Sequence, residues 1–387
     1  MLRLLSITLL AGCELVFALD DPGPTPPPPG EEVCGGNDPL ALFDGCRNAL
    51  HPEISRPATI RTGDIADPTD PGDCDEILVQ TDLDATELCL IVADDVELAN
   101  TVVVGPRPLV LMAADELVIS GPVLVTSRGA QQAAGGDFAS CTSLAGGQSP
   151  VGAGAGDGGG GGGSFGTQGG DGGNGSVALS GGPGGAAGVV TLPLTFIRGG
   201  CRGGAGGRNT VTGAGGGAGG RSGGAIYLVA GDRITLEGTG TIDVSGEGGA
   251  GGAPGAMTGG GGGGGGGGSG GLIAFDAPQI VLAPFSRLIA NGGGGGGGGS
   301  GENIAGARGA SANSGDAFPF PAAGGGGTQA GDGGDGTDAV IAVGSVAGHS
   351  VGDNFGGGGG GGGGGLGLIL LFGEVQDQGA STSPQLP

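Results

Sequence analysis

Seven cysteines and two histidines are the residues whose chemistry most constrains this chain of 387 residues. One of them, Cys13, lies at the end of an apolar leader. An even number of remaining cysteines favours disulfides in an exported protein, and we expect neighbouring cysteines to pair. No Cys-x-x-Cys occurs and His51 and His349 are isolated, so we expect neither a zinc site nor another cofactor. The expected disulfides are Cys34–Cys46, Cys74–Cys89 and Cys141–Cys201.

A second candidate for metal chemistry is the segment 333–341, which fits the nonapeptide of calcium-binding β-rolls. It makes Asp335 and Asp338 weak calcium candidates. That chemistry needs tandem copies, because each ion sits between successive turns. The near-copy at 169–174 carries Asn174 and lacks the apolar position. A chance match is therefore the favoured interpretation, and no metal site is expected.

Candidate catalytic carboxylates are few. Polysaccharide-degrading enzymes built on parallel β-helices need clustered carboxylates on one strand face. Asp232, Asp243 and Asp276 instead fall at separate turn or outward positions, where we expect them to be solvated. The chain has no lysine and its arginines are scattered. We therefore expect no catalytic residues and no enzyme activity, with a β-helical polysaccharide-degrading enzyme and a calcium-dependent surface module as the alternatives.

The elements that position these residues are short strands in a repeat. Residues 88–104 align without a gap on 109–125, at an offset of 21, and apolar positions recur every eight residues. Within each segment apolar residues alternate, which is typical of strands. Three short strands per repeat predict an all-β fold, a short parallel β-helix (solenoid), right-handed by the usual crossover rule.

Glycine supplies 106 residues, far above the usual share of roughly 7 %. In the first repeat the chain turns quickly after Val104, whereas after Val125, Val244 and Ala290 long glycine-rich loops begin. The loops should therefore leave one corner of the solenoid. They are either flexible linkers or threefold polyglycine-II helices packed side by side, and we favour the packed form.

The formal charge is −25, and 22 of the 38 acidic residues precede residue 129. Such a surface repels phosphate backbones, so nucleic acid is not an expected partner. The excess acid favours solubility, with loose binding of divalent cations as the second interpretation.

The N-terminal residues predict export. Arg3 precedes the apolar run 4–10, which is too short to span a bilayer. The following Leu10-Ala11-Gly12-Cys13 resembles the lipobox of bacterial lipoproteins. The resemblance implies a signal peptide removed before Cys13 and a lipid, such as palmitate, attached to that cysteine. Residues 20–32 are rich in proline and would form a semi-rigid spacer. An ordinary secretory signal cut further on is the other interpretation.

As a whole the chain resembles the glycine-rich, β-helical surface lipoproteins of Gram-negative bacteria. The resemblance implies an outer-membrane or cell-surface protein, held by a lipid anchor, with a structural or adhesive role and a surface polymer or protein as its ligand. We expect five segments: signal peptide 1–12, acylated cysteine and tether 13–32, disulfide-bearing cap 33–75, solenoid with glycine-rich insertions 76–373, and polar tail 374–387.

Overall fold

A computed structural model describes most of the chain from Glu32 onward. The described residues are 32–36, 41–43, 45–81, 86–129, 131–138, 141, 145–148, 155–176, 181–190, 194–209, 213–255, 260–301, 303–312, 322–337 and 356–386. The signal peptide, Cys13, the tether and Asp338 lie outside them. Across the described ranges the fold is all-β, without a helix. Accordingly, no helix in this part is long and apolar enough to cross a membrane.

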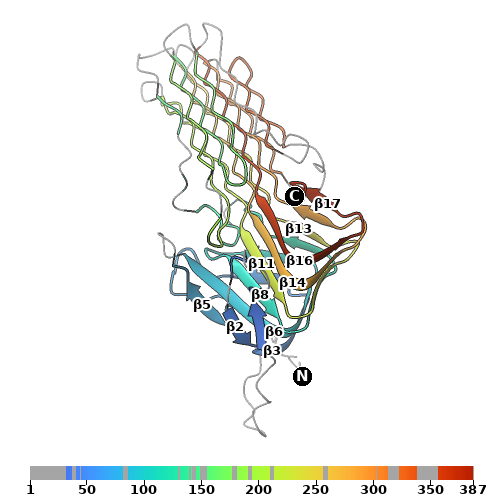
Figure 1. The fold of residues 1–387 in the computed structure, drawn as a ribbon. Coiled ribbons are helices and arrows are strands. Elements are labelled where there is room, and N and C mark those ends of the chain that lie inside the picture. The colour runs from blue at the N-terminus through green and yellow to red at the C-terminus, as the bar shows by residue number, and fades with distance from the viewer. Residues whose placement is uncertain are drawn as a thin grey trace, which may run out of the picture.

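Most strands belong to two sheets of mainly parallel strands (Figure 1). The six-stranded sheet is entirely parallel. In sheet order it contains β17 (Ser381–Ser383), β15 (Arg287–Ile289), β13 (Thr241–Asp243), β10 (Pro122–Leu124), β7 (Thr101–Val104) and β4 (Thr59–Arg61).

The second sheet has nine strands, and its two longest strands, β6 and β14, each pair along their length with two shorter ones. β6, for example, pairs with β8 along its first half and with β9 along its second. The main path is β11 (Ala225–Ala230), β8 (Leu109–Ala113), β6 (Glu87–Leu98), β9 (Glu116–Ile119), β12 (Arg233–Leu236), β14 (Leu272–Leu282) and β16 (Leu368–Asp377), and both β3 (His51–Ser55) and the antiparallel β5 (Glu76–Val79) pair with β6.

The ungapped offset of 21 residues is correct for the middle strand of the repeat, where Val96 pairs with Leu117. It is wrong for the first strand, where Leu109 pairs with Cys89 rather than Leu88. A slip of one residue turns a side chain to the opposite face of a sheet. Leu88 therefore packs in the cluster beneath the N-terminal cap, while Leu109 packs in the core between the sheets.

The first strand of a later repeat shows the same one-residue shift. Ile226 pairs with Ile273, so Leu272 faces the cap instead of the core. In the third strand Val123 pairs with Thr101, which is 22 positions earlier. The corners between strands therefore differ in length by one residue, which an ungapped alignment cannot represent.

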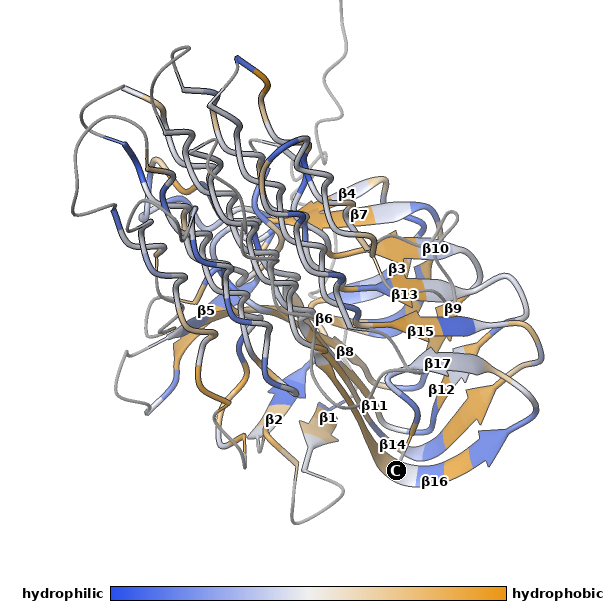
Figure 2. Cartoon of the chain, turned by 90° about the horizontal axis from the view of Figure 1, so that it is seen from above, coloured by the Kyte–Doolittle hydropathy of each residue, from blue (hydrophilic) through white to orange (hydrophobic). Residues whose placement is uncertain are grey.

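Alternating aliphatic side chains fill the space between the sheets, and Figure 2 shows the hydrophobic segments concentrated in the strands. A separate hairpin, β1 (Glu32–Gly35) with β2 (Gly45–Asn48), covers the outer face of the nine-stranded sheet, where Phe43 lies 6.3 Å from the ring of Tyr227. The disulfides pair as expected, Cys34–Cys46, Cys74–Cys89 and Cys141–Cys201.

The sheets extend beyond the expected segment boundaries at both ends. β3 and β4 already pair in parallel with β6 and β7, so the repeat begins near residue 51 rather than 76. The expected boundary at residue 373 falls inside β16, and β17 adds a strand within the expected polar tail.

The glycine-rich segments leave the sheets at one edge. They follow β10, β13 and β15, which are neighbours in one sheet, and they return to β11, β14 and β16 in the other. Figure 1 shows them rising together from one end of the sheets, away from β2 and β3. We call the described residues of 145–224, 244–271 and 291–367 the glycine bundle.

Candidate functional site: the glycine bundle and its base

The run 260–271 lies at the centre of the glycine bundle. Its N–H groups donate in three directions, and each direction recurs every third residue. Gly261, Gly264 and Gly267 donate to the segment 356–362, Gly262, Gly265 and Gly268 to 247–253, and Gly263 and Gly266 to 204–207.

The carbonyl groups of the same run accept hydrogen bonds in three further directions. Donors from 157–163, from 217–223 and from 293–299 meet its oxygens, again at every third residue. The run is therefore enclosed by six neighbouring segments, and its backbone groups are satisfied without belonging to a helix or a sheet. Satisfied backbone groups are what burial of a loop requires.

This enclosure explains the uninterrupted glycine. A Cβ atom added to any residue of 260–268 would lie between 1.8 and 2.2 Å from a backbone oxygen of a neighbouring segment. Gly264, for example, would place it 2.0 Å from the oxygen of Gly296. Only glycine allows backbones to approach this closely.

In parts of the bundle, exposed side chains recur at every third residue. In the segment 201–209, Arg202, Ala205 and Arg208 are exposed while most residues between them are buried. Arg202 donates to the oxygen of Gly219 at 3.2 Å, and Glu247 accepts from Arg308 at 3.0 Å. Most charged side chains of the bundle are thus on its surface, while Asp157 and Arg198 are buried.

The calcium-like motif and its near-copy form the same outward arrangement. Asp335 of the motif accepts the N–H of Gly324 at 2.8 Å, and Asp332, just before the motif, accepts that of Gly327 at 2.7 Å. In the near-copy, Asp171 and Asn174 accept those of Ala187 and Gly184, both at 2.8 Å. Asp335 therefore caps a backbone group of the adjacent segment.

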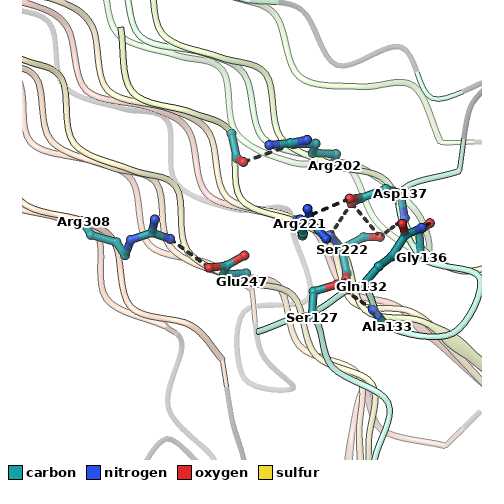
Figure 3. A network of polar contacts seen from close by, with 11 residues as sticks. Ser127, Gln132, Ala133, Gly136, Asp137, Arg202, Arg221, Ser222, Glu247 and Arg308 are labelled. Atoms are coloured by element: carbon teal, nitrogen blue, oxygen red, sulfur yellow. Dashed lines mark hydrogen bonds and ion pairs between the residues drawn. The ribbon is translucent and has the colours of Figure 1, made fainter. Parts of the chain in front are cut away.

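The base of the bundle is held to the sheets by a polar network around Ser222 (Figure 3). Asp137 and Ser222 are joined by three hydrogen bonds, and Arg221 lies 3.9 Å from the Asp137 carboxylate. Ser127 donates to the oxygen of Ser222 at 2.9 Å and accepts the N–H of Ala133. This network joins the start of the first glycine loop to its return.

A buried arginine, Arg198, also anchors the first glycine loop. The guanidinium of Arg198 lies 4.5, 5.0 and 5.9 Å from the ring centroids of Phe165, Phe138 and Phe196. One of its nitrogens is 3.6 Å from the sulfur of Cys201, in the Cys141–Cys201 disulfide. Such cation–π contacts are strengthened by burial.

The expectation that the strand carboxylates are solvated is wrong for two of the three. Asp232 is exposed, but Asp243 and Asp276 are fully buried and not solvated. Asp276 accepts the N–H of Gly36 at 2.7 Å and the hydroxyl of Tyr227 at 3.3 Å, so it ties the cap to β14. Burial, with the Asp276 carboxylate as a second cause, raises the pKa of Tyr227.

Within the described residues, one group brings together three residues of metal-ligating types, Glu32, Cys34 and Cys46. Both sulfurs belong to a disulfide, which removes the thiolates that a metal would need. His51 contacts Asp75, 2.8 Å from Nε2 to Oδ1.

No protein-family model matches the chain, and neither a curated protein nor a solved structure matches it.

Proposed function

We propose that this chain is a lipid-anchored cell-surface protein with a structural or adhesive role, in which a parallel β-helix supports a bundle of polyglycine-II helices. The enclosure of run 260–271 by six segments is the observation that carries the proposal. A bundle held by backbone hydrogen bonds is rigid, so it suits projection of its far end from a surface. Catalysis is not part of the proposal.

The β-helix is supported by the way the chain repeats. Each repeat contributes one segment to the six-stranded sheet and two to the nine-stranded sheet, and successive repeats pair in parallel. Stacking of such repeats is how solenoid proteins build a continuous core.

The polyglycine-II form is supported by the spacing of the hydrogen bonds. A left-handed threefold helix returns to the same direction every third residue, as the donors of run 260–271 do. Six neighbours correspond to three donor and three acceptor directions around each such helix.

The surface location rests on the Leu10-Ala11-Gly12-Cys13 motif and on the placement of the bundle. Strands β2 and β3 lie at the end of the molecule away from the bundle (Figure 1). A lipid on Cys13, followed by the spacer 20–32, would therefore leave the bundle pointing away from the membrane.

To test this proposal, the full chain is displayed on Gram-negative cells, and three variants are compared with the unmodified protein. Cys13→Ala should move the protein from the membrane fraction to the soluble fraction. Gly264→Ala should leave it in the membrane but reduce attachment of the cells to surfaces or to other cells, whereas Gly215→Ala, whose added Cβ meets nothing within 4 Å, should not. If cells displaying Gly264→Ala attach as well as cells displaying the unmodified protein although the bundle is not formed, the adhesive role is overturned. If Cys13→Ala stays in the membrane fraction, the lipid anchor is overturned.

A further inference from the structure

A polar cavity of about 350 Å³ lies where the glycine bundle meets the sheets. Its walls come from the two exits that follow β10 and β13 and from the segment 303–312. Thr126, Arg128, Ser245, Glu247 and Ser311 line it. Figure 3 shows Glu247 and its partner Arg308 beside the base network. The volume is within the range of small-molecule pockets, roughly 300–1,000 Å³.

Several lining groups retain hydrogen-bonding capacity. The Thr126 side chain is buried, and its Oγ1 has no hydrogen-bond partner among the described residues. The hydroxyls of Ser245 and Ser311 accept backbone N–H groups, both at 3.3 Å, and neither O–H has an acceptor among the described residues, so each can donate to a ligand. Hydroxyl groups of this kind can serve a ligand as donors, and Thr126 also as an acceptor.

The charged groups narrow the class of ligand. Glu247 is oriented by Arg308, while the side chain of Arg128 is exposed and has no ion-pair or hydrogen-bond partner in the described part of the chain. A small anion in the cavity would meet Glu247, and a small cation would meet Arg128. A neutral molecule with many hydroxyl groups satisfies both, because each hydroxyl donates and accepts.

We propose that this cavity binds one neutral sugar residue of a surface polysaccharide. The inference rests on the proposed adhesive role and names the chemistry of its ligand. No aromatic ring lines the cavity among the described residues, so the sugar has no ring face to stack on. The Kd for a single sugar residue should therefore be on the order of 1 mM. Several copies of the protein on one cell surface would strengthen attachment to a polysaccharide.

The test uses the full disulfide-bonded chain and saturation-transfer NMR with glucose, galactose and N-acetylglucosamine. Gluconate and glucosamine serve as the anionic and cationic comparison probes. At least one neutral sugar should bind more tightly than either charged probe. Arg128→Ala should weaken binding about tenfold. Ser311→Trp should abolish it by filling the cavity, and Arg208→Ala, an exposed arginine elsewhere on the bundle, should leave it unchanged.

The proposal is overturned if no neutral sugar shows transfer at about 10 mM, if only the charged probes bind, or if Ser311→Trp binds as the unmodified protein does. Unfolding curves of the variants establish that they are folded. Loss of sugar binding alongside intact cell attachment would remove this inference and leave the proposed adhesive role standing. Loss of cell attachment with intact sugar binding would remove the proposed adhesive role and leave the sugar site standing.

Discussion

Asp137 and Ser222 hold each other by reciprocal hydrogen bonds across 85 residues of chain: the N–H of Asp137 donates to Ser222 Oγ at 2.7 Å, and the N–H of Ser222 donates to Asp137 Oδ1 at 2.9 Å. Ser222 is fully buried. The pair closes the first glycine loop at its base.

Removing either side chain should destabilise the base. Asp137→Ala or Ser222→Ala leaves a donor without its acceptor, which costs about 1–3 kcal/mol in the free energy of unfolding. The double variant should lose less than the sum of the two, because the Ser222 hydroxyl also donates to Asp137 Oδ1 at 3.4 Å and either single replacement already removes that bond. Denaturant unfolding measures all three, with the exposed Asp232→Ala as a control within roughly 0.5 kcal/mol of the unmodified protein. Additive losses would contradict the coupling.

Gly264 and Gly215 form a matched pair for testing the packing of the glycine bundle. An alanine at 264 would place its Cβ 2.0 Å from a backbone oxygen, while at 215 it meets nothing within 4 Å. Gly264→Ala should cost about 1–3 kcal/mol or more and lower Tm by several degrees. Gly215→Ala should be neutral, or stabilising by about 0.4–1 kcal/mol, because alanine restricts the unfolded chain. Equal melting temperatures for both variants would show that the bundle is not closely packed.

The sequence predicted more of the sheets than of the site. Alternation located Val96 and Leu117 correctly, because a strand with one buried face has a fixed period. The ungapped offset misplaced Leu88, because the corners vary by one residue and carry no aliphatic pattern. The cysteine pairing was predictable from order along the chain alone.

Two features of the site depend on contacts between residues far apart in the sequence, which local sequence patterns do not predict. Asp276 is buried because Gly36, 240 positions earlier, donates to it, so its outward-facing sequence context was misleading. The six neighbours of run 260–271 come from segments whose glycines carry no side-chain pattern. The one available signal was the three-residue spacing of Asp171 with Asn174 and of Asp332 with Asp335, which marks outward positions of the bundle.

Tyr227 provides a pH prediction that is free of overlapping signals. It is the single tyrosine in a chain without tryptophan, so ultraviolet absorbance of tyrosinate reports this residue alone. Burial raises its pKa, so the folded protein should not ionise near the ordinary value of about 10, whereas the denatured protein should. Above that pH the unfolded state binds fewer protons than the native state, and stability should fall as pH rises. Ionisation of the folded protein near pH 10 would contradict the buried contact with Asp276.

The Cys141–Cys201 disulfide closes the longest of the three disulfide loops, with a sequence separation of 60 against 12 for Cys34–Cys46. Loop-closure entropy assigns it about 4 kcal/mol, compared with about 3 kcal/mol for the shorter loop. The paired replacement of Cys141 and Cys201 by serine should therefore lower the free energy of unfolding more than the same change at Cys34 and Cys46. The reverse order, measured by denaturant unfolding under oxidising conditions, would mean that the 141–201 link does not restrain the bundle.

Hydrogen–deuterium exchange of the amides in run 260–271 tests the central claim most directly. These amides belong to no helix or strand, yet the bundle gives most of them a backbone acceptor on a neighbouring segment. Exchange should be slowed to a degree comparable with that of β11 and β14, since protection follows hydrogen bonding and burial. Exchange at the rate of an unstructured glycine peptide would contradict an ordered, closely packed bundle.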